Sequence, residues 1–160
     1  MDIRIVSGGQ TGVDRAALDA AIELGIPYGG WCPAGGWAED LPEPPGVLAR
    51  YPRLRATPGV EPAERTRWNV RDSDATLILL DSDPPAPSSG TALTIAVAAA
   101  LGRPSAIVDM GAASAREAVA TLIAAMARGD ALNVAGPRES GSPGIYARAR
   151  ALLTEVLAER

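Results

Sequence analysis

The first of three glycine- and hydroxyl-rich segments that could bind an anion is Ser7-Gly8-Gly9-Gln10-Thr11-Gly12-Val13-Asp14. Glycines let backbone N–H groups approach an anion, and a helix N-terminus adds about half a positive charge. The spacing is neither that of a Walker A loop nor that of a G-x-G-x-x-G motif. A tight turn capped by Thr11 and Asp14 is the structural alternative, and Asp14 would repel a phosphate if it pointed inward. The glycine density exceeds what a cap requires, so the segment predicts an anion-binding loop.

The second segment, Pro87-Ser88-Ser89-Gly90-Thr91, combines hydroxyl groups with a glycine just before an apolar stretch. If a helix begins here, its free N–H groups and the hydroxyls of Ser88, Ser89 and Thr91 could hold an oxyanion. A serine that only caps the helix is the alternative. We favour a binding role for Ser88, Ser89, Gly90 and Thr91.

The third segment is Asn133-Val134-Ala135-Gly136-Pro137-Arg138-Glu139-Ser140, which places an arginine and an acid beside a Gly-Pro turn. A solvated turn in which Arg138 and Glu139 pair with neighbours is the alternative. Three such segments, each at the end of an expected strand, favour a shared binding edge. Gly136, Arg138, Glu139 and Ser140 are therefore candidate binding residues.

A polar stripe is expected on the helix that includes residues 65–74. Arg65, Asn69 and Asp72 are spaced i, i+4, i+7, so they share one helix face. If this stripe is buried it needs partners, which a ligand or a second subunit could supply. A salt-bridged surface face is an equally good interpretation. Arg65 and Asn69 join the candidate binding residues.

The residue types that are missing limit the chemistry. The chain has no His, which removes the commonest general base, the Ser-His-Asp and Cys-His arrangements and the usual zinc sites. The single cysteine, Cys32, is expected to be a small buried apolar residue rather than a nucleophile. The pairs Glu39/Asp40 and Asp81/Asp83 lack the spacing of a metal loop, so no metal site is predicted. Asp109 ends a strand at the same edge, as many structural residues do.

Strands that alternate with helices must position these segments, and they predict a Rossmann-like three-layer α/β/α fold with parallel strands. Strands are expected at 2–6, 26–31, 75–80, 105–109 and 131–135, with a short one near Leu54 inside a long loop, 32–58. Helices are expected at 12–24, with Arg15, Asp19 and Glu23 on a polar face, and at 62–73, 90–101, 114–128 and from Pro143 onward. The 90–101 helix is apolar nearly all round, so it is expected to be central or at a subunit interface. The apolar face of the last helix comprises Ile145, Ala149, Leu152, Leu153, Val156 and Leu157.

The composition agrees with a single domain that spans residues 1–160. The length fits one domain, 47% of the residues are hydrophobic, and the net charge is −4. All basic residues are arginines, and no basic stripe is visible, so nucleic-acid binding is not expected. The apolar run at 92–101 is too short to span a membrane, and no signal peptide precedes the first strand. We expect a cytoplasmic protein.

These segments also carry a resemblance to a known family. SGGQTGVDRAALDAAIELGIPYGGWCP, RTRWNVRDSDATLIL, SSGTALTIAVAAALGRP and LNVAGPRES are similar to the "putative molybdenum-carrier" family, over about residues 5–153. That family belongs to a Rossmann-like (SLOG) superfamily with the lysine-decarboxylase-like phosphoribohydrolases. The resemblance implies a five-stranded parallel sheet, a homo-oligomer (dimer or tetramer), and molybdenum cofactor, a pterin with a terminal phosphate, as ligand. Its motifs match Gly8–Thr11, Ser88–Thr91 and Gly136, Arg138, Glu139 and Ser140.

The chain departs from its relatives at three places. Ala34, Gly35 and Gly36 follow Cys32-Pro33, where basic residues are common, and Ser89 replaces a common glycine. The phosphoribohydrolases have a Gly-Gly-x-Gly-Thr loop with a downstream catalytic Glu, and the segment after Gly90-Thr91 has none. The expected function is therefore a carrier or binding protein for molybdenum cofactor or a nucleotide. A nucleoside 5′-monophosphate hydrolase that uses Glu139 or Asp72, and a nucleotide sensor, remain as alternatives.

Overall fold

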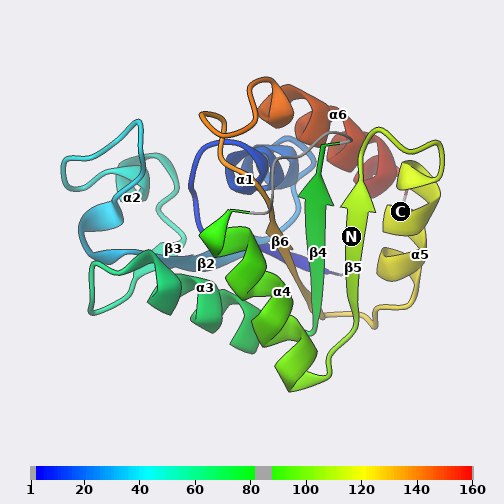
Figure 1. Cartoon of the computed structure of the whole chain (residues 1–160), viewed down its shortest axis with the longest axis horizontal. Coiled ribbons are helices and arrows are strands. Elements are labelled where there is room, and N and C mark those ends of the chain that lie inside the picture. The colour runs from blue at the N-terminus through cyan, green and yellow to red at the C-terminus, as the bar shows by residue number, and fades with distance from the viewer. Residues whose placement is uncertain (1–2, 82–87, 160) are drawn as a thin grey trace.

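A single, entirely parallel sheet organises the molecule. The computed structural model describes residues 3–81 and 88–159 and places six strands in the order β3-β2-β1-β6-β4-β5 (Figure 1). Their bounds are β1 (Arg4–Val6), β2 (Tyr28–Cys32), β3 (Leu54–Ala56), β4 (Ala75–Leu80), β5 (Ser105–Asp109) and β6 (Ala131–Ala135). All five strand pairings are parallel. The predicted α/β fold is confirmed.

The strand count corrects one expectation, because the sheet has six strands rather than five. The additional strand is β3, the short segment near Leu54, which pairs with β2 in the register Gly30↔Leu54. It extends the sheet at one edge, and β5 forms the other edge. The predicted strand at 2–6 is observed as Arg4–Val6, and Asp2 lies outside the described residues.

Helices cover both faces of the sheet, which makes three layers (Figure 1). One face carries α1 (Val13–Glu23), α5 (Ala115–Ala124) and α6 (Ile145–Ala158), which pack on one another and on the central strands. The other face carries α3 (Pro62–Arg71) and α4 (Ser89–Leu101). None of the described helices has the length and hydropathy needed to cross a bilayer.

The main core lies between the sheet and the α1, α5 and α6 layer. β4 is a continuous apolar strand whose residues are buried up to Leu79, as expected for a parallel strand covered on both faces. Of the apolar face expected on the last helix, all members except the half-buried Leu152 are fully buried. The core therefore fixes the positions of the strand ends from which the loops emerge.

Segment 32–58 has more structure than the long loop expected from the sequence. It contains a 3-10 turn, η1 (Ala34–Gly36), the short helix α2 (Val47–Arg50) and β3. A second small core beneath it includes the predicted buried Cys32 together with Val47 and Tyr51. The segment is thus packed onto α1 and β2.

The polar face expected on α1 is covered by other parts of the protein at Arg15 and Asp19. Arg15 is 5% exposed, and its guanidinium donates to both Asp40 carboxylate oxygens at 2.6 and 2.9 Å and to the Gly9 carbonyl. Asp19 accepts hydrogen bonds from the hydroxyls of Tyr51 and Tyr146, each at 2.6 Å. The packed segment 32–58 covers this face, which the helical pattern alone could not reveal.

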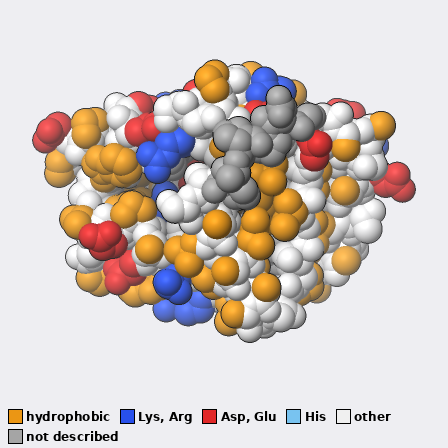
Figure 2. Space-filling view, viewed as in Figure 1, with side chains coloured by type: hydrophobic (Ala, Val, Ile, Leu, Met, Phe, Trp, Pro, Cys, Tyr) orange, Lys and Arg blue, Asp and Glu red, His pale blue; other side chains and the backbone are white. Residues whose placement is uncertain are grey.

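Helix α4 is not central, which removes one of the two alternatives expected from its composition. It lies in the outer layer, where Leu101 is 42% exposed, and Ile107 on the neighbouring strand β5 is 53% exposed. Hydrophobic side chains gather over this helix in the space-filling view (Figure 2). A subunit interface at this face stays a prediction.

The strand order brings the ends of β1, β4 and β6 side by side, and with them the first turn of α4 and the loops after β1 and β6. The chain runs outward from β1 to β3 on one side and from β4 to β5 on the other, and β6 then enters between β1 and β4. The carboxyl ends of these three strands therefore lie together at one edge of the sheet, where open α/β sheets bind ligands.

Candidate functional site

A cavity opens where the loops after β1 and β6 and the first turn of α4 meet. Its empty space is about 550 Å³, including the part open to solvent. Its walls come from the loops after β1 and β6, the N-terminal part of α4, and one face of α3. The residues that line it are Gly8, Gln10, Asp14, Arg65, Thr66, Asn69, Ser88, Gly90, Thr91, Thr94, Asn133, Val134, Ala135, Gly136 and Arg138.

The structure brings most of the sequence-predicted candidates to this cavity and leaves the others outside its lining. The lining includes Gly8, Gln10, Arg65, Asn69, Ser88, Gly90, Thr91, Gly136 and Arg138. The candidates outside it are Ser7, Gly9, Thr11, Gly12, Ser89, Glu139 and Ser140. Pro87 of the second segment, Asp83 and the rest of the loop at 82–87 lie outside the described residues.

Arg65 of α3 ties the first loop to the opposite layer. It is 8% exposed, donates from Nη1 to the Gly8 carbonyl at 2.9 Å, and lies 3.7 Å from an Asp14 carboxylate oxygen. A Cβ on Gly8 would collide with this guanidinium, so the glycine makes room for Arg65. Arg65 is buried at the cavity wall. At this position the polar stripe is therefore a buried face that needs partners, rather than a salt-bridged surface face.

The other members of the stripe have protein partners. The side-chain amide of Asn69 accepts from the Trp31 N–H at 2.7 Å and donates to the Trp31 carbonyl at 3.0 Å, so it pairs both backbone groups of this β2 residue. Asp72 accepts from the Trp31 indole at 2.8 Å and from Arg71, and it lies at the surface rather than in the cavity lining. The stripe therefore runs from the cavity wall at Arg65 and Asn69 to the protein surface at Asp72.

Asp14 is the one carboxylate among the described residues of the cavity lining, and it was not among the predicted binding residues. Burial raises the pKa of its carboxyl above the ordinary value, although the nearby Arg65 guanidinium opposes that shift. Among the described residues no side chain caps α1, so the capping alternative for Thr11 and Asp14 is not realised. The Asp14 carboxyl faces the cavity instead, where its ionised form disfavours the binding of another negative group beside it.

Gln10 contributes an unsatisfied donor. The side chain is 6% exposed, and its Oε1 accepts from the backbone N–H groups of Thr11 and Glu39, each at 3.0 Å. Its Nε2 has no hydrogen-bond partner in the part of the chain that the structure describes. Because buried polar groups in proteins are nearly always paired, this amide is a strong indication of a missing ligand.

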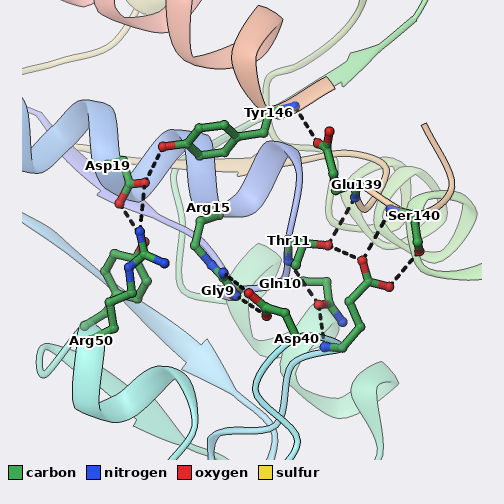
Figure 3. Close-up of polar contacts among 12 residues, drawn as sticks. Gly9, Gln10, Thr11, Arg15, Asp19, Asp40, Arg50, Glu139, Ser140 and Tyr146 are labelled. Carbon is green, nitrogen blue, oxygen red and sulfur yellow. Dashed lines mark hydrogen bonds and ion pairs between the residues drawn. The ribbon is translucent and has the colours of Figure 1, made fainter. Parts of the chain in front are cut away.

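Three of the candidates outside the cavity form a network with Glu39 (Figure 3). We call this network the loop clamp and define it as Thr11, Glu39, Glu139 and Ser140. Glu39 accepts from the hydroxyls of Thr11 and Ser140, and Thr11 Oγ1 accepts from the Glu139 N–H at 3.1 Å. Although partial burial opposes it, these hydrogen bonds from Ser140 and Thr11 hold the pKa of the Glu39 carboxyl below its ordinary value. The clamp joins the loops after β1 and β6.

Glu139 caps α6 with its carboxylate. One oxygen accepts from the Gly144 N–H at 2.5 Å and the other from the Tyr146 N–H at 2.9 Å. These contacts direct the side chain away from the cavity. Neither Glu139 nor Asp72 therefore lies where a hydrolase would need its acid.

At the start of α4, Ser88 Oγ accepts from the Thr91 N–H at 3.2 Å, which is the plain N-cap of the structural alternative. Ser88, Gly90 and Thr91 also line the cavity, and their role in binding stays a prediction. A Cβ placed on Gly90 would meet no other described part of the protein within 4 Å. The first turn of α4 thus faces open space in the cavity.

The remaining lining residues were missed by sequence reasoning. Asn133 is 3% exposed and Thr94, whose hydroxyl donates to the Gly90 carbonyl, is 3% exposed. A polar residue inside the otherwise apolar run of β6 was a usable signal for Asn133, because buried amides need partners. Within residues 3–81 and 88–159, no group of three or more Asp, Glu or Cys side chains is arranged to hold a metal ion.

Fold and cavity together define a Rossmann-like α/β protein with a polar ligand cleft at the carboxyl edge of its sheet. More specifically, the chain belongs to the circularly permutated YpsA SLOG family, whose sequence profile matches residues 5–157. It is 39% identical to a protein from Syntrophus aciditrophicus SB whose crystal structure carries the name "Putative molybdenum carrier protein". That match covers 96% of this chain and 92% of the other, with a TM-score of 0.78. No curated protein sequence matches.

Proposed function

We propose that this protein binds and carries a small phosphate-bearing ligand in the cavity at the carboxyl edge of the sheet. The observation that carries the proposal is the meeting of three kinds of donor around one open space. These are the first turn of α4 at Ser88 and Gly90, the lining residue Arg138, and the unpaired amide of Gln10. A helix N-terminus and an arginine suit a phosphate. The Arg138 guanidinium lies 3.7 Å from a Glu39 carboxylate oxygen and its side chain is 44% exposed, so a bound phosphate would draw it from this ion pair.

Molybdenum cofactor is the first candidate ligand, and a nucleotide is the second. The name of the 39% identical protein favours the former, and both present a terminal phosphate attached to a heterocycle. The polar groups in the cavity lining suit a phosphate and a polar ring. Cys32 lies outside the lining, in the small core beneath segment 32–58. The chain's residues would therefore hold the organic part of such a ligand, which carries its metal as cargo.

Thermal shift with the full chain tests the proposal against inorganic phosphate, nucleoside monophosphates and molybdenum cofactor. Saturation at about 100 times the dissociation constant adds roughly 2.7 kcal/mol, which is a rise of several degrees for a domain of this size. We expect a rise with one phosphorylated class. A panel without any shift would contradict the carrier function.

A pair of variants at Gly90 locates the site. Gly90→Asp places a negative charge in open space at the first turn of α4, and Gly90→Ala places only a methyl group there. We expect the aspartate variant to lose ligand binding through charge repulsion, and the alanine variant to keep it. Equal binding by both variants would move the phosphate away from α4.

A nucleotide hydrolase is the second candidate, because one carboxyl does line the cavity. Burial raises the pKa of Asp14, as occurs for acids that protonate a leaving group. Release of the base from nucleoside monophosphates, lost in Asp14→Asn, would establish this activity. Turnover at background level in both proteins would leave the carrier function alone.

A further inference from the structure

Two walls of the cavity differ in chemistry. Ser88 and Gly90 lie at the start of α4, whereas Gln10 comes from the loop before α1 and Asp14 from the first turn of α1. The first turn of α1 already contains the Asp14 carboxyl, which lies 3.7 Å from Arg65, and the first turn of α4 contains no acid. The partial positive charge of the α4 N-terminus therefore suits the phosphate better, and the Gln10 donor is left for another part of the ligand.

The orientation of the Gln10 amide is fixed by the backbone. Both hydrogen bonds from Thr11 N–H and Glu39 N–H reach Oε1, as Figure 3 shows, so the other end of the amide must be the NH₂ group. A flipped amide would set NH₂ against two N–H donors. The donor that remains buried without a described partner is thus a property of the fold and not of an arbitrary rotamer.

We propose that Gln10 Nε2 is a specificity-determining donor that binds an uncharged carbonyl oxygen on the heterocycle of the phosphorylated ligand. The inference rests on the proposed function and names the ligand class: a phosphate ester whose ring carries an exocyclic oxygen. A ring amino group at the same place would set donor against donor. Such a site rejects the analogue that leaves its buried donor unpaired, which is a strong source of discrimination.

Two nucleotides that differ mainly in this feature make the test. Inosine monophosphate has a carbonyl at position 6 of the purine, and adenosine monophosphate has an amino group there. We expect titration calorimetry on the full chain to give about tenfold tighter binding of the inosine nucleotide, which is the free energy of one good hydrogen bond.

Gln10→Glu converts the donor to an acceptor and keeps an oxygen for the N–H groups of Thr11 and Glu39. We expect the preference to disappear or invert. The new carboxylate also repels every anion in the cavity, so the value to compare is the ratio of the two nucleotide affinities. Glu61→Gln, a single charge change at an exposed position outside the described lining, is the control and should not alter this ratio.

Two results would overturn the inference. Equal affinity of the wild-type protein for both nucleotides would do so without any variant. An unchanged ratio of the two affinities in a folded Gln10→Glu protein would also do so, because Gln10 would then not distinguish the rings. In either case, binding of a nucleotide or of inorganic phosphate still supports the proposed function. If neither nucleotide nor inorganic phosphate binds, the proposed function and this inference are both wrong.

Discussion

The loop clamp and the cavity are built from the same kinds of residue, and they differ in whether those residues are satisfied. In the clamp, the carboxylates of Glu39 and Glu139 accept from hydroxyls and backbone N–H groups that the protein itself supplies. In the cavity, the amide of Gln10 keeps a free donor, and the first turn of α4 faces open space. The residue types alone predicted which edge of the sheet is polar. The hydrogen-bond partners then distinguish the loop clamp, whose polar groups are paired, from the cavity, where the Gln10 donor is unpaired.

The largest effect is expected at Arg65, which lines the cavity and binds the Gly8 carbonyl of the loop after β1. Arg65→Met leaves the Gly8 carbonyl and the buried Asp14 carboxylate without their cation, and removing one partner of a buried pair costs about 3–5 kcal/mol. We expect the midpoint of thermal unfolding to fall by about 2–4 °C for each kcal/mol.

Asp14→Asn in the Arg65→Met background should restore part of this loss, because it removes the unpaired charge. Chemical denaturation of the four proteins of this cycle measures the coupling. Additive losses would mean that Arg65 supports the fold only through Gly8.

Thr11→Val breaks the clamp without touching the cavity lining. It removes the hydroxyl that joins Glu39 to the Glu139 N–H, and we expect a loss of about 1–2 kcal/mol in the free energy of unfolding. The dissociation constant for whichever phosphorylated probe binds should change little. If binding were to weaken as much as in Gly90→Asp, the distinction between the two regions would be wrong.

The two acids respond to pH in opposite directions. The pKa of Glu39 is lowered in the folded protein, so its contribution to stability is present above the ordinary value of 4.5 and is lost as pH falls below it. The pKa of Asp14 is raised, so its carboxyl favours the folded state at low pH, and that contribution is lost as pH rises from 3.8 through the folded value.

Urea unfolding across this range should therefore show a shallower acid loss in Glu39→Gln and a shallower loss toward neutral pH in Asp14→Asn. Wild-type protein measured in parallel is the reference. Identical pH profiles for all three would show that neither carboxyl changes its pKa on folding.

The smallest effect on stability is expected outside both regions, on the exposed face of α4. Ala96→Glu lies on this face and should change the free energy of unfolding by no more than about 0.5 kcal/mol. If the predicted homo-oligomer forms through this face, light scattering should show wild-type protein above 16.4 kDa and the variant at that mass. Wild-type protein at 16.4 kDa would make the oligomer prediction wrong.

Local patterns predicted the elements and the edge of the sheet well. The apolar run of β4, the glycine segment before α1 and the proline at the start of α3 each act over a few residues, so the sequence reveals them directly. The roles of individual polar residues depended on partners far along the chain. Glu39 bonds to Ser140 and Arg65 to Gly8, and no periodicity encodes such pairs. Asn69 and Asp72 share a helix face, yet only the first reaches the cavity lining.

The place of β6 has a consequence for how the protein is synthesised. This strand enters between β1 and β4, and the strand with the loop after it supplies Asn133, Gly136 and Arg138 to the cavity lining. Before these residues are added, β1 and β4 each lack one neighbouring strand and the cavity lacks one wall. Contacts between residues so distant in sequence slow folding and leave open edges that can associate wrongly. The cavity can therefore form only once the chain has been synthesised past Arg138.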